Sequence, residues 1–140
     1  MSKPPVTLSL TWVEGLRFRA RTPDGRTLPT DSDGREGLSP VELLGSATAA
    51  CMAIDVVHIL TKARLPLTGL AVTFTGRRAE TEPRRLVAIR MAFTVEGAVP
   101  QAQLDRAIQL SRDKYCSVWN SLREDTELEI TTEIRVPASR

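Results

Sequence analysis

Histidine, cysteine and aromatic residues are scarce in this chain of 140 residues, which has one histidine, two cysteines and 4% aromatic residues. Structural zinc sites draw their ligands from close pairs of cysteine or histidine, and this sequence has no CxxC pair. A metal centre is therefore not expected. An excess of charge of one sign is also lacking, because the net charge is only +2. The composition thus gives no indication of a nucleic-acid partner.

A secretory signal is also missing from the first residues. The segment MSKPPVTLSLTW has neither the long apolar core nor the small-residue cleavage site of such a signal. We therefore expect an intracellular, cytoplasmic protein. In a reducing compartment two cysteines rarely form a permanent disulfide, which leaves inert buried thiols or a transient redox pair. Both interpretations remain open on this evidence.

One long segment with little charge runs from Leu43 to Leu60, and its 18 residues reach the length of a membrane span. Asp55 and His58 would be costly in lipid, and the first half of the segment consists largely of glycine, alanine, serine and threonine. The sequence therefore predicts a helix buried in protein and no membrane association.

The start of this helix is well marked. Ser39 is a favourable N-cap, Pro40 suits the first helical position, and Glu42 completes a capping box with Ser39. The helix is expected to end near Lys62. Since apolar or small residues surround it on nearly all sides, a second copy of the chain is expected to cover part of it, which predicts a homodimer.

Hydrophobic periodicity predicts the remaining elements. Their order indicates one α+β domain over residues 1–140, with helices packed on antiparallel sheets. A break in the second helix is expected around Cys116. The predicted strands cover residues 6–12, 16–21, 26–29, 70–75, 86–95 and 128–136, and the second helix covers about 100–122.

The cysteines are the candidate reactive groups. A thiol attacks an electrophile as its thiolate, which nearby arginine or lysine favours. The alanines around Cys51 leave space for a substrate or serve close helix packing, and spacing alone does not decide between the two. Asp55, one turn beyond Cys51 on the same helical face, and His58 are both more simply interpreted as structural residues.

The sequence segments around the two cysteines, taken together, resemble those of a known family. The segment PVELL from Pro40, with Cys51 eleven residues after the proline, is followed by AIDVVHIL, a GRRAE…P hairpin and AIQLSRDKYCSV. This arrangement resembles the OsmC/Ohr family of peroxide-reducing proteins, most of all its OsmC-like branch, from about Trp12 to Ile134. The resemblance implies an intertwined homodimer with two antiparallel sheets, two central helices and active sites at the subunit interface.

The resemblance also implies a thiol-dependent peroxidase. Cys51 would attack the O–O bond of an organic hydroperoxide and become a sulfenic acid, and Cys116 would then form a disulfide with it. A dithiol or lipoyl-type reductant would reopen the disulfide, so neither a metal nor another cofactor is implied.

The charged residues that would assist the Cys51 thiolate differ from the pattern of the family. Its peroxidase branches have a glutamate directly after the helix-opening proline, where this chain has Val41, and Glu42 follows one residue later. Glu42 is the candidate for the same role, although on an ideal helix it points about 180° away from Cys51, so that it would act from the loop region or across the dimer. Arg35 is the first candidate for the arginine that supports the thiolate, and Arg17 is the second.

Two alternative functions remain. The same dimer could bind a small apolar or thiol-bearing ligand without redox cycling, which the departure at Val41 favours. Arginines on the predicted hairpins could also form a basic strip for nucleic acid, but no recognition motif accompanies them, so a solvated sheet face is favoured. These arginines are Arg17, Arg19, Arg21, Arg77, Arg78, Arg84 and Arg85.

Overall fold

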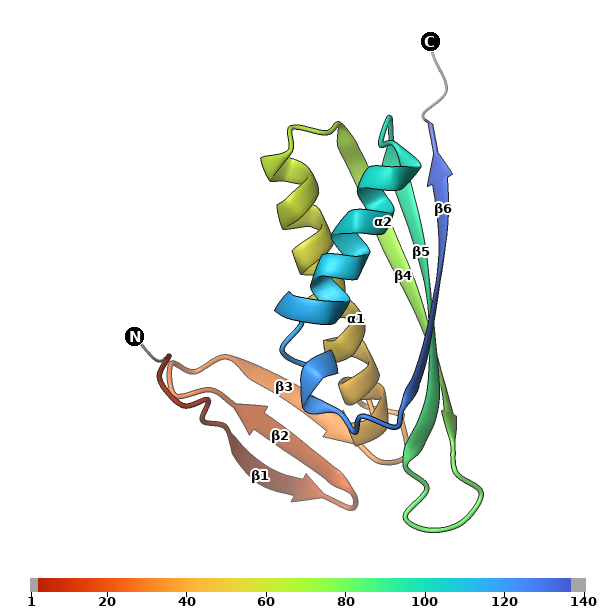
Figure 1. The fold of residues 1–140 in the computed structure, drawn as a ribbon. Coiled ribbons are helices and arrows are strands. Elements are labelled where there is room, and N and C mark those ends of the chain that lie inside the picture. The colour runs from red at the N-terminus through yellow and green to blue at the C-terminus, as the bar shows by residue number, and fades with distance from the viewer. Residues whose placement is uncertain (1–2, 137–140) are drawn as a thin grey trace. The chain divides into compact units, whose positions relative to one another are not determined.

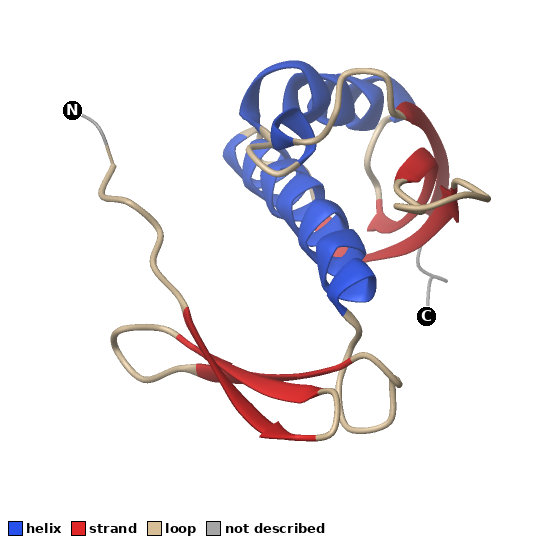
Figure 2. Ribbon diagram, turned by 90° about the horizontal axis from the view of Figure 1, so that it is seen from below, coloured by secondary structure: helices blue, strands red, loops and turns tan. Residues whose placement is uncertain are grey.

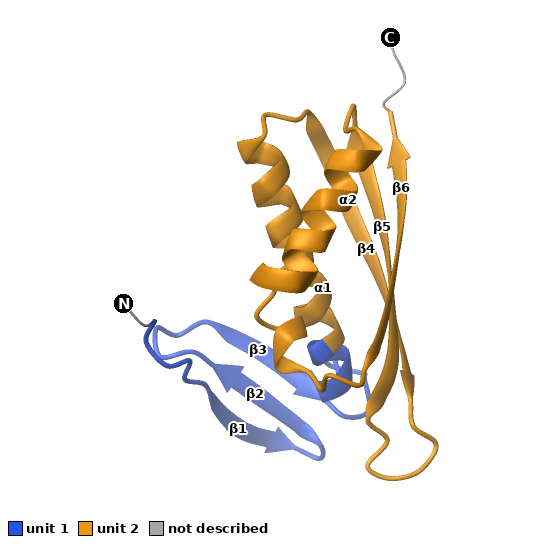
Figure 3. Ribbon diagram, in the orientation of Figure 1, with its two compact units in different colours: residues 1–44 blue, residues 45–140 orange. Residues whose placement is uncertain are grey.

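The structure, a computed structural model, describes residues 3–136. They form two compact units, of which unit 1 extends to Leu44 and unit 2 begins at Gly45 (Figure 3). The elements are, in chain order, β1 (Ser9–Glu14), β2 (Arg17–Arg21), β3 (Thr27–Asp31), α1 (Pro40–Lys62), β4 (Leu67–Arg78), β5 (Leu86–Gly97), α2 (Gln101–Leu110), the π-helical turn η1 (Ser111–Tyr115), the 3₁₀ turn η2 (Trp119–Ser121) and β6 (Glu127–Arg135).

Unit 1 is an antiparallel three-stranded meander followed by the first turn of α1. Strand β2 pairs with β1 on one side and with β3 on the other. The capping box forms as expected: the Ser39 N–H donates to Glu42 Oε1 at 2.9 Å, and the Glu42 N–H donates to Ser39 Oγ at 3.2 Å. These two bonds satisfy backbone and side-chain groups that a helix start would otherwise leave unpaired.

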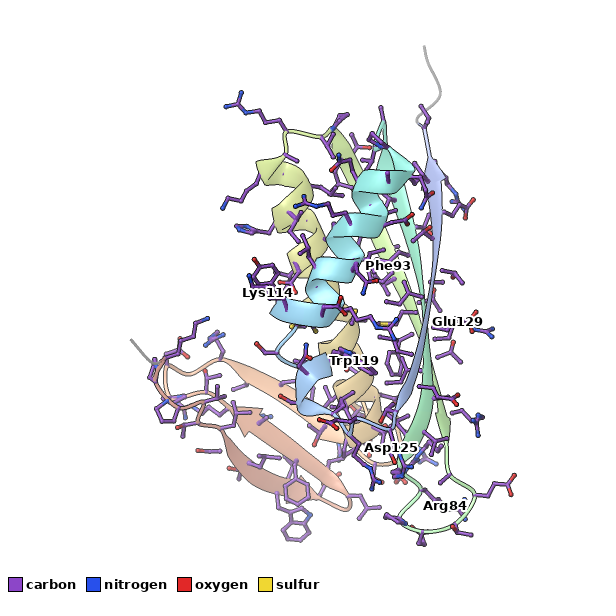
Figure 4. The ribbon with its side chains drawn as sticks, in the orientation of Figure 1. Arg84, Phe93, Lys114, Trp119, Asp125 and Glu129 are labelled. Carbon is purple, nitrogen blue, oxygen red and sulfur yellow. The ribbon has the colours of Figure 1, made fainter. Side chains whose placement is uncertain are left out.

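Unit 2 contains a three-stranded sheet in the order β4–β5–β6, and the helices α1 and α2 cover one face of it (Figures 1 and 2). Its hydrophobic core joins alternate residues of β5 to one stripe of each helix. Phe93 lies between sheet and helices, whereas Glu129 points away from them (Figure 4). The fully buried core side chains include Met52, Val56, Leu60, Met91, Phe93, Val95, Leu104 and Ala107.

Two helices and two three-stranded sheets confirm the predicted α+β class. One part of the prediction is wrong, because β6 pairs parallel with β5 and the second sheet is therefore mixed. The physical reason is the crossover. Since α2 carries the chain back along the sheet before β6 begins, β6 runs in the same direction as β5.

The interruption of the second helix expected near Cys116 is confirmed. Helix α2 ends at Leu110, the π-helical turn η1 follows, and Cys116 itself has an extended backbone with ψ of 99°. A new short turn, η2, then starts at Trp119.

Among the described residues, α1 is long and apolar enough to cross a membrane by length and composition. Core helices of soluble proteins have the same properties. The side chains of Met52, Val56 and Leu60 are fully or almost fully buried in the core of unit 2, which is the arrangement of a core helix.

The end of β5 gives a stability prediction. Gly97 has φ of +134°, and a Cβ on it would lie 2.0 Å from the carbonyl oxygen of Pro66. Because that neighbour is backbone, the Gly97→Ala chain is expected to lose at least ~3 kcal/mol of unfolding free energy, measured by urea denaturation. Gly15→Ala is the matched control, since Gly15 has φ of +53° but open space around it, and ~1 kcal/mol is expected there. Equal losses in the two variants would contradict the prediction.

Candidate functional site

The two thiols meet inside unit 2. Cys51 lies in the middle of α1 and is half-buried, whereas Cys116 follows η1 and has no exposed surface. Their side chains lie close enough to interact, since Cys51 contributes to the raised pKa of Cys116. Neither thiol is in a disulfide. A pair of thiols in direct contact can close into a disulfide with little rearrangement, and the side-chain geometry therefore permits redox chemistry.

Hydrogen bonds from backbone and side chain fix Cys116 from both sides. Its N–H donates to the Ser111 carbonyl oxygen at 2.8 Å, an i→i+5 bond that closes the π-helical turn. The Trp119 N–H donates to Cys116 Sγ at 3.3 Å, and Asn120 Nδ2 donates to the Cys116 carbonyl at 2.8 Å. In Figure 4, Lys114 and Trp119 mark the turns on either side of this cysteine. The sulfur is thus held by two successive short turns.

The environment of Cys116 favours its neutral form. Burial raises the pKa of its thiol to about 11, with smaller upward contributions from the hydrogen bond and charge of Cys51 and from the charge of Asp55. The Trp119 N–H, which would stabilise a thiolate, lowers the pKa but does not offset the burial. At neutral pH, Cys116 is therefore a thiol, which is a weak nucleophile.

A polar contact joins the elements that carry the cysteines. Ser111 Oγ donates to Asp55 Oδ2 at 2.7 Å, and Ser111 has no exposed surface. Asp55 lies one turn after Cys51 on α1, as the sequence indicated. Ser111 was not recognised from the sequence, which has no local signal for a contact between residues 56 positions apart.

Arg35 and Arg17, the candidate arginines, both belong to unit 1. Arg35 lies in the loop after β3, whose backbone N–H groups at Asp33, Arg35 and Glu36 donate to the Asp31 carboxylate at 2.9, 3.3 and 3.0 Å. These bonds lower the pKa of Asp31. Both arginines line a cavity of about 310 Å³ within unit 1. Arg17 forms an ion pair with Glu14, whereas none of the ion pairs among residues 3–136 uses Arg35.

Glu42 also belongs to unit 1, where it is the acid of the capping box. The Ser39 backbone N–H, and secondly the Ser39 hydroxyl, lower the pKa of its carboxyl group. Because the cysteines belong to unit 2, roles for Glu42 and for Arg35 at the thiol remain predictions.

Metal ligation has no candidate group in the described part of the chain. No cluster of three or more histidine, cysteine, aspartate or glutamate side chains occurs among residues 3–136. His58, the one histidine, is exposed on α1.

The raised pKa of Cys116 predicts a specific dependence of stability on pH. In the unfolded chain this thiol loses its proton near pH ~8.5, whereas in the folded chain it keeps the proton until about pH 11. Its contribution is therefore fully present below pH ~8.5 and is lost as pH rises towards 11, a loss of about 3 kcal/mol. Urea denaturation of the reduced parent chain and of Cys116→Ser, repeated at several pH values between these two pKa values, measures this loss of unfolding free energy. The variant is expected to lack this part of the alkaline loss, and parallel curves for the two chains would contradict the assignment.

Fold and site together define a class: an α+β protein whose long central helix carries one thiol beside a second thiol that directly follows a π-helical turn. The OsmC-like protein family matches residues 31–131. The chain belongs to this family.

Individual relatives agree with this assignment. The protein YhfA of Escherichia coli K12 is 37% identical over 125 residues, which cover 88% of this chain and 93% of that protein. The crystal structure of a hypothetical protein from Aquifex aeolicus VF5 has a TM-score of 0.88 and 28% identity, covering 97% of this chain and 100% of that one. An organic hydroperoxide resistance protein from Elizabethkingia anophelis shares the fold, with a TM-score of 0.65 and 16% identity over 96% of this chain and 100% of that one.

Proposed function

We propose that this protein is a thiol-dependent peroxidase that reduces organic hydroperoxides. The observation that carries the proposal is that the free thiols of Cys51 and Cys116 lie within interaction range of each other. Membership of the OsmC-like family supports it, as does the shared fold of a protein that confers resistance to organic hydroperoxides.

The exposure of the two sulfurs supports a nucleophilic role for Cys51 and a resolving role for Cys116. Cys51 is half-buried and Cys116 is fully buried, so a substrate reaches Cys51 first. The Cys51 thiolate attacks the distal oxygen of the hydroperoxide, an S–O bond forms and the O–O bond breaks. The alkoxide leaves and takes up a proton to become the alcohol, and Cys51 is oxidised to a sulfenic acid.

The second step forms the disulfide. The sulfur of Cys116 attacks the sulfur of the Cys51 sulfenic acid, the S–O bond breaks, and the hydroxide leaves as water with the proton of the Cys116 thiol. Because Cys116 is neutral and buried before this step, it does not compete for the hydroperoxide.

A dithiol or lipoyl-type reductant then completes the cycle. Its thiolate attacks the accessible sulfur of Cys51, and Cys116 leaves, with the Trp119 N–H directed at its sulfur. The second thiol of the reductant closes a disulfide in the reductant and releases Cys51. Two electrons thus pass from the dithiol to the hydroperoxide.

Other groups are proposed to support this reaction. Arg35, or in its place Arg17, would stabilise the Cys51 thiolate, and Glu42 would orient the arginine. The active form would be a cytoplasmic, intertwined homodimer. Apolar side chains exposed on α1 and β1 support dimerisation, since Ile54, Leu10 and Trp12 are 66%, 60% and 64% exposed.

Turnover of an organic hydroperoxide tests the proposal. The reduced protein is mixed with cumene hydroperoxide and dihydrolipoamide, and the remaining peroxide is measured with time. Consumption of many equivalents per chain is expected, with a rate proportional to protein concentration. Consumption no faster than in the mixture without protein would refute the peroxidase.

A second candidate function is a redox-inactive dimer that binds a small apolar or thiol-bearing ligand. The observation that favours it is the full burial of Cys116, since a thiol with a pKa near 11 is inert in most proteins. Retention of both thiols after a pulse of hydroperoxide would support binding over catalysis.

A further inference from the structure

Besides the interaction of the two thiols, a hydrogen bond from Ser111 to Asp55 joins the two halves of the thiol site, and the proposed peroxidase cycle does not use it. Ser111 Oγ donates to Asp55 Oδ2 at 2.7 Å, although the two residues are 56 positions apart in the chain. Asp55 comes from α1, one turn beyond Cys51, and Ser111 is the first residue of η1, the turn that leads to Cys116. The bond therefore links the helix of one sulfur to the turn of the other.

Ser111 transmits this link directly to Cys116. While its hydroxyl donates to Asp55, its carbonyl oxygen accepts the Cys116 N–H at 2.8 Å. That second bond is the i→i+5 closure of the π-helical turn. Turns of this kind are rare, and each needs a local reason to replace the regular helix. The buried hydrogen bond to Asp55 is one such reason. It holds Ser111 against α1 at the point where the helix changes to the wider π-helical turn that precedes Cys116.

We propose that Asp55 is a positioning residue for the disulfide step, acting through Ser111 to hold Cys116 Sγ against Cys51 Sγ. The inference deepens the proposed function, since it concerns the same pair of sulfurs and names a residue that keeps them in reach. It requires that the pair closes into a disulfide, whatever the oxidant.

The role of Asp55 depends on its hydrogen bond to Ser111 and not on its charge. None of the ion pairs within the described part of unit 2 involves Asp55, so its carboxylate is half-buried without a cation from that unit. An asparagine would accept the same hydrogen bond without the cost of burying a charge. Asp55→Asn therefore separates the hydrogen bond from the charge.

The test measures closure of the disulfide without a hydroperoxide. Diamide oxidises the two thiols and is itself reduced to a hydrazine: the Cys51 sulfur adds to it, and Cys116 then displaces the hydrazine and forms the S–S bond. Rapid acid quenching and mass spectrometry follow the closed form. Ser111→Ala and Asp55→Ala are expected to slow closure at least tenfold, whereas Ser111→Thr and Asp55→Asn, which keep the hydrogen bond, are expected to stay within threefold of the parent chain.

Two further readouts separate positioning from folding. The rate at which monobromobimane alkylates Cys51 is expected to be unchanged in Ser111→Ala and Ser111→Thr, because the helix of Cys51 is intact and no charge has changed. The equilibrium of the disulfide with dithiothreitol is expected to shift at least tenfold towards the open form in Ser111→Ala and Asp55→Ala alone. If Ser111→Ala does not fold, judged by circular dichroism, Asp55→Ala decides by the same measurements.

The outcomes are distinct from those of the peroxidase test. Two results would overturn the positioning role even if the protein turns over hydroperoxides. One is a rate of disulfide closure in Asp55→Ala within twofold of the parent rate. The other is closure in Ser111→Thr and Asp55→Asn that is as slow as in the alanine variants. Conversely, the protein could fail to turn over hydroperoxides while the variants show the expected rates of disulfide closure with diamide. That result would refute the proposed function and support the positioning role.

Discussion

Serine in place of Cys51 is expected to lower the turnover of cumene hydroperoxide at least ~100-fold, because a hydroxyl is a far poorer nucleophile than a thiolate towards the O–O bond. The fold is expected to persist, since Cys51 is only half-buried and serine differs from cysteine by one atom. The measurement is the initial rate of peroxide loss with dihydrolipoamide as reductant.

Ala53→Ser is a matched control for that experiment. It places a hydroxyl on the same helix, two residues further on, at another half-buried position, and turnover is expected to stay within about threefold of the parent rate because the nucleophile is intact. If Cys51→Ser consumed hydroperoxide as fast as this control, Cys51 would not be the nucleophile and the proposed function would fail.

Replacement of Cys116 by serine is expected to separate the two steps. Cys51 still attacks one hydroperoxide and becomes a sulfenic acid, but no second sulfur is present to close the disulfide. The sulfenic acid then persists and is oxidised to the irreversible sulfinic acid by excess hydroperoxide. Steady-state turnover with dihydrolipoamide is expected to fall at least ~10-fold as the protein is inactivated in this way.

Mass spectrometry identifies the species in that variant. After one equivalent of cumene hydroperoxide the chain is expected to gain the mass of one oxygen atom, or of a trapping reagent such as dimedone, and after excess hydroperoxide the mass of two. Turnover equal to that of the parent, without addition of oxygen, would show that Cys116 does not resolve the sulfenic acid.

The sequence predicted those parts of the site that depend on local signals. The capping box at Ser39 and Glu42 marked the start of α1, and the helical pattern of residues 100–122 predicted a break around Cys116. Both are confirmed by the structure. Helix caps and hydrophobic periods act over a few residues, so a single sequence carries enough information for them.

Contacts between distant segments were not predictable in the same way. The bond from Ser111 to Asp55 joins residues 56 positions apart, and no local pattern distinguishes this serine from others in the chain. The parallel pairing of β6 with β5 was missed for a related reason, since alternation shows that a segment is a strand but not the direction in which it pairs. The proximity of the cysteines itself followed only from the resemblance to a family.

The supporting charges show a further limit. The sequence placed Glu42 at a helix start and Arg35 in a polar loop, and the structure describes each of these local environments. Their predicted roles concern Cys51, which belongs to unit 2. These roles therefore require contacts beyond unit 1, which local sequence signals do not predict. Arg35→Ala and Glu42→Gln, measured by the same turnover assay, address those roles directly.

The central claim is that sulfurs 51 and 116 of one chain exchange two electrons with an organic hydroperoxide. The most direct test treats the reduced protein with one equivalent of cumene hydroperoxide, blocks remaining thiols, digests the chain without reductant and maps the peptides by mass spectrometry. A single cross-linked peptide containing Cys51 and Cys116, with the intact chain lighter by two hydrogen atoms, is the predicted result. Recovery of both cysteines as free, alkylated thiols would contradict the account.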